Sequence, residues 1–183
     1  LELIARANRI TFWVATTILL APDVDARRRL TERFIVLCKM LRDLNNFNTL
    51  MAVSAGLNMS AVNRLHKTWA ALSVTARQIW DSTQELLAPQ QSFKRYRAAL
   101  RDVEPPCVPY LGCYLTDLTF VEDGNPDEVA DPAQPERKLI NFAKRELVCN
   151  TLLDIKLMGQ DTPYKIEPAE PLYSCLRELA YLP

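Results

Sequence analysis

Residues 30–44 of the chain read LTERFIVLCKMLRDL, and this stretch decides the fold class. Apolar side chains recur in it in steps of three and four residues, at Leu30, Phe34, Leu37, Leu41 and Leu44. That spacing places them on one face of an α-helix, with the charged residues on the other. We therefore predict an amphipathic helix that ends at the two asparagines of residues 45–46.

The same period extends to both sides of this helix. Periodic segments cover residues 3–18, 50–57, 60–65, 73–87 and 92–103, and Ser60, Ser73 and Ser92 stand where helices are expected to begin. The chain has only four glycines, too few for the many tight turns of a β-sandwich or barrel. The sequence predicts an all-α fold, a single compact helical domain of about eight helices.

The helical periodicity is interrupted at residues 104–109, where EPPCVP has three prolines in six positions and cannot be helical. A helix is predicted over 110–123, and Gly124, Asn125 and Pro126 are a stop signal. We predict a polar loop at 127–136, a second, unusually apolar helix at 139–158, and a last helix carrying Leu172, Leu176 and Leu179.

Composition excludes several classes of function. Lys plus Arg and Asp plus Glu each total 22, so the net charge is zero, which argues against a nucleic-acid partner. No apolar run reaches the length of a membrane-spanning helix and the N-terminus does not resemble a signal peptide, so we expect no insertion into a membrane. The chain does not begin with Met, and we expect it to be part of something longer.

Cysteine and histidine limit the chemistry further. The chain has five widely spaced cysteines without a C-x-x-C pair, which indicates buried, reduced thiols in a cytoplasmic protein. With a single histidine, His66, no multi-histidine metal site can form, and no glycine-rich phosphate loop is present. We predict no metal and no cofactor. His66 lies among basic neighbours without an evident catalytic partner, so we do not expect an unrelated helical enzyme that uses it.

Six short motifs are more specific than composition. In order they are LNNFNTLM (44–51), NRLHKTW (63–69), PPCVPYLG (105–112) running into YLTDLTF (114–120), EDGNP (122–126), LINFAKR (139–145) and TPY (162–164). Their order and spacing resemble the catalytic domain of Ras-family guanine nucleotide exchange factors. The resemblance covers residues 1–183 and corresponds to the C-terminal three-quarters of that domain.

The resemblance implies an activity without covalent chemistry, and in that sense not an enzyme. Such a domain binds a Ras-subfamily small GTPase, preferably nucleotide-free, and promotes GDP release by inserting a protruding helical hairpin at the switch and nucleotide site. Here the hairpin corresponds to residues 110–158. The family's location implies a cytoplasmic protein recruited to the inner face of the membrane where the GTPase resides.

The resemblance also assigns residues. Thr119 falls near the Mg²⁺ site of the GTPase and Asp123 near its phosphate site, and the two are one helical turn apart. Many family members carry Glu where this chain has Asp123. The alternative interpretation of Asp123 is a solvated residue at a helix end.

Five further residues are expected to contact the GTPase: Leu57, Asn58, Asn63, Thr116 and Asn125. Leu57 can equally be plain core, Asn125 a helix stop and Thr116 a capping hydroxyl. Ile140, Asn141 and Phe142 are expected to bury the second hairpin helix against the domain body, with Phe142 as the core anchor.

Two departures from the family pattern support a second hypothesis. Asp123 stands where many members carry Glu, and Glu146–Leu147 stands where the family often continues with basic residues. In a further departure, the loop at 127–137 is longer than in compact members. The alternative function is therefore a non-catalytic GTPase-binding or scaffold module of the same fold.

Overall fold

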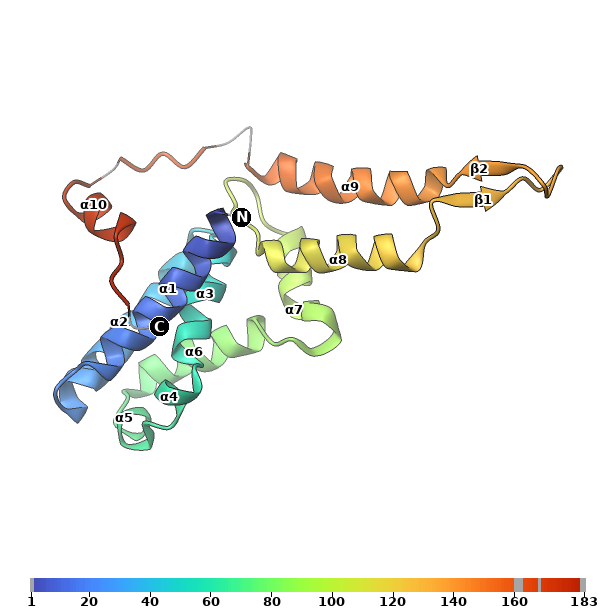
Figure 1. The fold of residues 1–183 in the computed structure, drawn as a ribbon. Coiled ribbons are helices and arrows are strands. Elements are labelled where there is room, and N and C mark those ends of the chain that lie inside the picture. The colour runs from blue at the N-terminus through green and yellow to red at the C-terminus, as the bar shows by residue number, and fades with distance from the viewer. Residues whose placement is uncertain (1, 160–162, 168, 182–183) are drawn as a thin grey trace.

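A computed structural model describes residues 2–159, 163–167 and 169–181. Ten helices and one small sheet make up this described part (Figure 1). In chain order they are α1 (Glu2–Leu19), α2 (Val24–Asp43), α3 (Phe47–Leu57), α4 (Ser60–Asn63), α5 (His66–Ala70), α6 (Val74–Leu86), α7 (Gln90–Arg101), α8 (Leu111–Gly124), β1 (Glu128–Ala130), β2 (Lys138–Ile140), α9 (Phe142–Gly159) and α10 (Leu172–Arg177). The all-α prediction is confirmed, and the number of helices is larger than predicted because residues 60–70 form two short helices.

The body of the molecule is built on α1, α2 and α3. The apolar stripe of α2 faces inward, where Phe34, Ile35 and Leu41 are buried. Asp23 caps this helix, since its carboxylate accepts a hydrogen bond from the Ala26 amide at 2.7 Å. Residues 45–46 end it as predicted, and Asn46 then caps α3 by accepting from the Thr49 amide.

α1 and α3 approach each other closely at Gly56. A Cβ added there would lie 2.6 Å from the Thr11 carbonyl oxygen and 2.7 Å from the Val14 Cβ. The contact is also polar, because the Thr11 hydroxyl donates to the Ala52 carbonyl at 2.9 Å. Glycine is thus required by the helix–helix distance rather than by a turn.

Of the three serines predicted to cap helix N-termini, one does so and two do not. Ser73 caps α6 as expected, accepting from the Ala76 amide at 3.3 Å. Ser60 does not cap, since α4 begins after Met59 without a side-chain hydrogen bond. Ser92 lies between Gln91 and Phe93 in a stretch with positive φ, so the regular part of α7 begins later. An N-cap needs extended backbone, which neither residue adopts.

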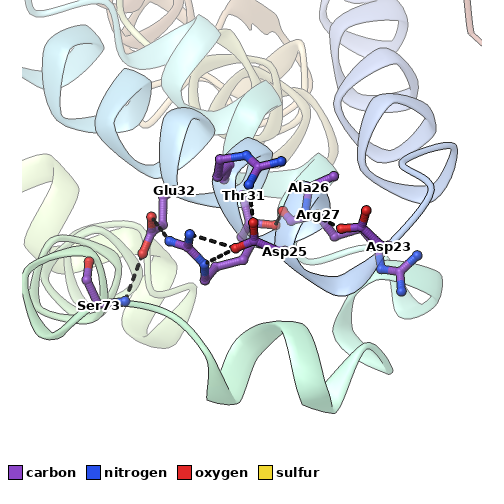
Figure 2. Close-up of polar contacts among 9 residues, drawn as sticks. Asp23, Asp25, Ala26, Arg27, Thr31, Glu32 and Ser73 are labelled. Atoms are coloured by element: carbon purple, nitrogen blue, oxygen red, sulfur yellow. Dashed lines mark hydrogen bonds and ion pairs between the residues drawn. The ribbon is translucent and has the colours of Figure 1, made fainter.

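A polar bridge connects α2 with the start of α6 (Figure 2). One Glu32 oxygen accepts from the Ser73 amide at 2.8 Å, and the other pairs with Arg28 at 2.8 Å. Arg28 also pairs with Asp25 on the preceding turn. The bridge satisfies one of the amides that the N-terminus of a helix leaves unpaired.

α8 and α9 run antiparallel and project from the body as a hairpin, with β1 and β2 at its far end (Figure 1). The strands pair antiparallel in the register Glu128↔Ile140 and Ala130↔Lys138. Two predictions are corrected here, because the loop at 127–136 includes β1, and residues 139 and 140 belong to β2 rather than to a helix. These strands are short and mostly exposed, so they have no alternating apolar pattern to detect.

The base of the hairpin is fixed to α7. The buried Tyr96 hydroxyl accepts from the Tyr110 amide at 2.8 Å. Arg97 forms a two-pronged ion pair with Asp117, both distances 2.8 Å. The proline-rich segment is held as well, since the Val108 amide donates to the Asn45 carbonyl at 2.9 Å.

The chain returns to the body after the hairpin. Tyr164 donates to the Leu44 carbonyl at 2.5 Å, and Tyr181 stacks on Phe12 of α1. The predicted last helix is present as α10, but it ends at Arg177 and so does not include Leu179. Of the motif at 162–164, residue 162 lies outside the described residues. Within the described residues, none of the helices combines the length and apolar character needed to cross a bilayer.

The cysteines only partly follow the prediction. Cys38, Cys107 and Cys113 are buried, as expected for structural thiols. Cys149 on α9 and Cys175 on α10 are exposed, which corrects the expectation for these two. The reason is that neither the hairpin nor α10 is covered on its outer side.

Candidate functional site

Thr116, Thr119 and Asp123 lie on the exposed side of α8. Each threonine hydroxyl donates to the backbone carbonyl four residues earlier, at 2.8 and 2.9 Å respectively. This bond orients the hydroxyl oxygens and leaves their lone pairs open to solvent. The structure thus places all three residues on the projecting hairpin, where an external partner can reach them.

Asp123 is unusual for its position in the helix. It lies in the last turn of α8, and among the described residues its carboxylate has no hydrogen bond or ion pair. A negative charge at a helix C-terminus opposes the macrodipole. The side chain therefore does not stabilise the helix it belongs to, and its charge is available to a partner.

A buried lysine holds the end of α8 next to Asp123. Lys144 is only 3% exposed, and its Nζ lies 2.6 Å from a Glu122 oxygen and 2.9 Å from Asp127 Oδ1. Hydrogen bonds from Lys144, with the Arg145 charge beside them, hold the pKa of Asp127 below its ordinary value. A buried charge needs such partners, and here they join both helices of the hairpin.

Sequence reasoning missed this role of Lys144. The residue was part of the LINFAKR motif, but nothing in a linear pattern signals that a lysine is buried. Its partners are 17 and 22 residues away in the chain. Their convergence depends on the antiparallel pairing of α8 and α9.

Asn125 and Asn141 complete this network. The Asn125 amide donates to the Val121 carbonyl at 3.0 Å, and the residue is half-buried after the end of α8. Asn141 donates to the Pro126 carbonyl at 2.8 Å and accepts from the Lys144 amide at 3.1 Å. Both side chains are engaged within the hairpin, so the helix-stop interpretation of Asn125 has direct support.

Phe142 does not have the expected position. It is 77% exposed and its neighbour Ile140 is 73% exposed, so the prediction that they anchor the second helix in the core is wrong. They lie at the end of the hairpin far from the body, where no other element covers them (Figure 1). Asn141 and Lys144, both polar, fix this end of α9 instead.

The hairpin also carries large exposed apolar side chains along both helices: Leu115, Phe120, Leu147, Leu152, Leu153 and Leu157. Their exposed fractions range from 46% for Leu153 to 70% for Phe120. Concentrated exposure of this kind marks a surface that binds another macromolecule.

A second group of candidate residues lies at the end of α3. Asn58 is exposed, and its amide donates to Gln84 Oε1 on α6 at 2.9 Å. Gln84 in turn donates to the Ser54 hydroxyl at 3.0 Å. Asn63 is exposed and points its amide at the Asn58 carbonyl at 3.5 Å. The structure therefore brings Asn58 and Asn63 together, as the sequence led us to expect.

Leu57 does not belong to this surface. Its side chain is completely buried, so we correct its assignment as a contact residue and place it in the core. Gln84 is the residue that sequence reasoning missed. It also borders an open groove of about 800 Å³ between α6 and α7, whose polar lining includes Gln90, Lys94 and Arg95.

His66 is exposed at the start of α5 and lines a pocket together with the basic side chains of Arg27, Arg64 and Lys67. Over residues 2–159, 163–167 and 169–181, no group of three or more His, Cys, Asp or Glu residues is arranged to hold a metal ion. The arrangement on α8 and α3 offers charge, hydrogen bonds and apolar surface to a partner.

Comparison with known proteins gives a consistent result. Residues 1–146 match the model of the RasGEF domain. The chain is 42% identical over 179 residues to Ras guanine nucleotide exchange factor R of Dictyostelium discoideum, which covers 98% of the chain and 10% of that protein. It is 33% identical over 175 residues to Ras-specific guanine nucleotide-releasing factor 1 of Mus musculus, covering 96% of the chain and 13% of that protein. The chain thus spans about a tenth of the length of these two curated relatives.

Proposed function

Because the chain belongs to the RasGEF domain family, we propose that it promotes GDP release from a Ras-subfamily small GTPase. The α8–α9 hairpin would enter the switch and nucleotide site of the GTPase. The observation that carries this proposal is the unpaired Asp123 carboxylate near the end of a projecting helix, one turn beyond Thr119.

The proposed chemistry is electrostatic. A carboxylate brought to the phosphate site repels the nucleotide, and at the Mg²⁺ site it competes for the hydroxyl that would otherwise bind the ion. Thr119 and Thr116 present hydroxyl oxygens on the same helix. The ion pairs of Lys144 would hold the end of α8 in place while the Asp123 carboxylate repels the phosphate groups of the nucleotide.

Binding would use two surfaces. The exposed leucines and Phe120 of the hairpin would pack against the first switch, and Asn58 with Asn63 would contact the second. Gln84 would position Asn58 through the hydrogen bond between their side chains. Asn125 would act at the hairpin through the backbone that it holds.

Release follows from linkage between two binding equilibria. A protein that binds the empty GTPase more tightly than the loaded form weakens nucleotide binding by the same factor. We therefore propose that the nucleotide-free form is the preferred partner and that no covalent step and no cofactor are involved. The protein would act in the cytoplasm, recruited to the inner face of the membrane that carries the GTPase.

The test is release of fluorescent GDP from a panel of Ras-subfamily GTPases, together with gel filtration of each GTPase before and after nucleotide removal. We expect faster release from at least one member and a stable complex only with its empty form, dissolved by GDP or GTP with Mg²⁺. Equal binding to loaded and empty GTPase would contradict exchange and identify a non-catalytic binding module instead.

A further inference from the structure

A pocket of about 360 Å³ lies between the start of α2 and the turn from α4 into α5. Four basic side chains line it, Arg27, Arg64, His66 and Lys67, and we refer to it as the basic pocket. The remaining lining residues are Val24, Leu65 and Thr68, so none of the acidic side chains that the structure describes faces the cavity. Three of the four basic groups carry a permanent positive charge at neutral pH.

These charges find no acidic partner in the part of the chain that the structure describes. Over the described residues, none of the four basic side chains forms an ion pair. Their neighbours on α2 differ, since Arg28 and Arg29 both pair with Asp25. The basic pocket therefore concentrates uncompensated positive charge in a chain whose net charge is zero.

The arginines are held in place by backbone carbonyls. Arg27 Nη1 donates to the Ala21 carbonyl at 3.0 Å, and Arg64 Nε donates to the Ser60 carbonyl at 3.2 Å. Each guanidinium has five N–H donors, so most donors remain free after these bonds. Arg27 Nε, by contrast, is buried and has no hydrogen-bond partner among the described residues, so the donors open to the pocket are those of the Nη atoms.

Backbone carbonyls thus orient the two arginine side chains and leave most of their N–H groups free. Such free, oriented N–H groups favour binding of a ligand with several negative charges. Guanidinium groups match phosphate oxygens in a two-pronged geometry, and a lysine adds a mobile point charge. We propose that the basic pocket binds a ligand that carries more than one phosphate group. The ligand's source is either a phosphoinositide headgroup at a membrane or a free polyphosphate.

The basic pocket is separate from the hairpin of the proposed exchange site, whereas its Arg64 follows Asn63 of the second proposed contact surface directly in the chain. α5 lies at the end of the body far from the tip of the hairpin (Figure 1). Occupancy of the pocket therefore leaves α8 accessible, and ligand binding can be measured without any GTPase. Failure of this proposal would leave the proposed function untouched.

Titration calorimetry with inositol hexakisphosphate as the probe tests the pocket. The double variant Arg27→Gln/Lys67→Gln should weaken binding by about tenfold or more, because it removes two charge-assisted contacts. The matched control Lys39→Gln/Arg42→Gln removes the same charge from the other end of α2 and should bind like the parent. If the double variant fails to fold, Lys67→Gln alone, at an exposed position, must still weaken binding several-fold. No saturable binding by the parent, or equal loss in both double variants, overturns the proposal.

Vesicles then identify the source of the ligand. We compare vesicles of phosphatidylcholine containing a phosphatidylinositol bisphosphate with vesicles of equal charge made with phosphatidylserine. Sedimentation of the parent, but not of the double variant, only with the phosphoinositide vesicles supports the lipid headgroup. Binding of the soluble probe without vesicle binding supports a free polyphosphate. Equal sedimentation of the parent and the double variant with both kinds of vesicle contradicts a specific pocket.

Discussion

Asp123 combines a proposed functional charge with an unfavourable place in its own helix. Its unpaired charge opposes the dipole at the C-terminus of α8, so removing the charge should not destabilise the fold. We expect Asp123→Asn to unfold within about 0.5 kcal/mol of the parent. Nucleotide release should slow by about tenfold or more, which corresponds to about 1.4 kcal/mol.

The matched control is Glu136→Gln, at an exposed acidic position between β1 and β2. It also removes one negative charge from the hairpin and should release nucleotide at the parental rate. If Asp123→Asn and Glu136→Gln behave alike, Asp123 is a solvated helix-end residue and its proposed role is wrong.

Glu32 should make stability depend on pH. The Ser73 amide and Arg28 hold the pKa of Glu32 below its ordinary value of 4.5 in the folded protein. A carboxylate with a lowered pKa stabilises the folded state above its unfolded pKa, and this contribution disappears as the pH falls through the folded value. We expect Glu32→Gln to cost about 1.5–3 kcal/mol at pH 7, as the loss of hydrogen bonds to a charged group does.

The difference between parent and Glu32→Gln should shrink steadily below about pH 4.5 in urea unfolding followed by circular dichroism. The same titration of Asp43→Asn, an exposed partner in a surface pair with Lys39, should run nearly parallel to the parent. A constant gap between Glu32→Gln and the parent from pH 7 to pH 3 would show that the bridge to Ser73 does not depend on charge.

At the scale of the element, the helix contact between α1 and α3 gives a matched pair of tests. Gly56→Ala puts a methyl group against the Thr11 carbonyl and Val14, so we expect a loss of about 1–3 kcal/mol. Gly124→Ala has no atom within 4 Å of the added Cβ and lies at the last position of α8, so it should be neutral or stabilise by about 0.5 kcal/mol. Thermal unfolding of both variants checks this, and equal effects would mean that the close helix contact is absent in solution.

The elements also show what sequence can and cannot predict. The apolar period predicted α2 correctly, but burial follows it only in part: Phe34 and Leu41 are buried where the helix meets α1 and α3, whereas Leu44, just after the last helical residue, is 44% exposed. Ile140 and Phe142 are equally apolar, yet they are exposed, because apolarity does not reveal whether another element covers a position. The strands escaped prediction because three residues with exposed side chains carry no period.

The candidate site likewise contains residues that the sequence predicts and residues that it does not. Thr119 and Asp123 were placed on one helix face by their spacing, and this required only local structure. Lys144 and Gln84 were missed, because each acts through partners that only the tertiary fold brings close. Leu57 lies beside an exposed asparagine in the sequence but points into the core, a difference that periodicity alone does not resolve.

At the scale of the whole molecule, Arg97 should control the direction of the hairpin. Its two-pronged pair with Asp117 joins α7 of the body to α8, beside the hydrogen bond between Tyr96 and Tyr110. We expect Arg97→Gln to keep both parts folded while broadening the distribution of distances between hairpin and body. Double electron–electron resonance between labels at Cys149 and at a cysteine replacing Lys39 measures that distribution.

The label positions follow from the thiols. Cys149 is exposed, whereas burial raises the pKa of Cys38 to about 12 and that of Cys107 to about 11, so these two remain protonated and unreactive. Cys175 is exposed and is replaced by serine in all samples. The control Arg95→Gln removes a surface charge on the same helix and should leave the distribution unchanged. Identical distributions for parent and Arg97→Gln would show that the other base contacts suffice.

The ribbon at the end of the hairpin has a consequence for how this domain can diverge. β1 and β2 are three residues each, their side chains are largely in solvent, and the segment between them includes two prolines. Insertions, deletions and substitutions there remove little buried surface, so they change folding stability little. The same segment belongs to the α8–α9 hairpin, which is the part of the molecule proposed to contact a partner. Substitutions, insertions or deletions between β1 and β2 can therefore change the partner preference of a related sequence without compensating changes in the core.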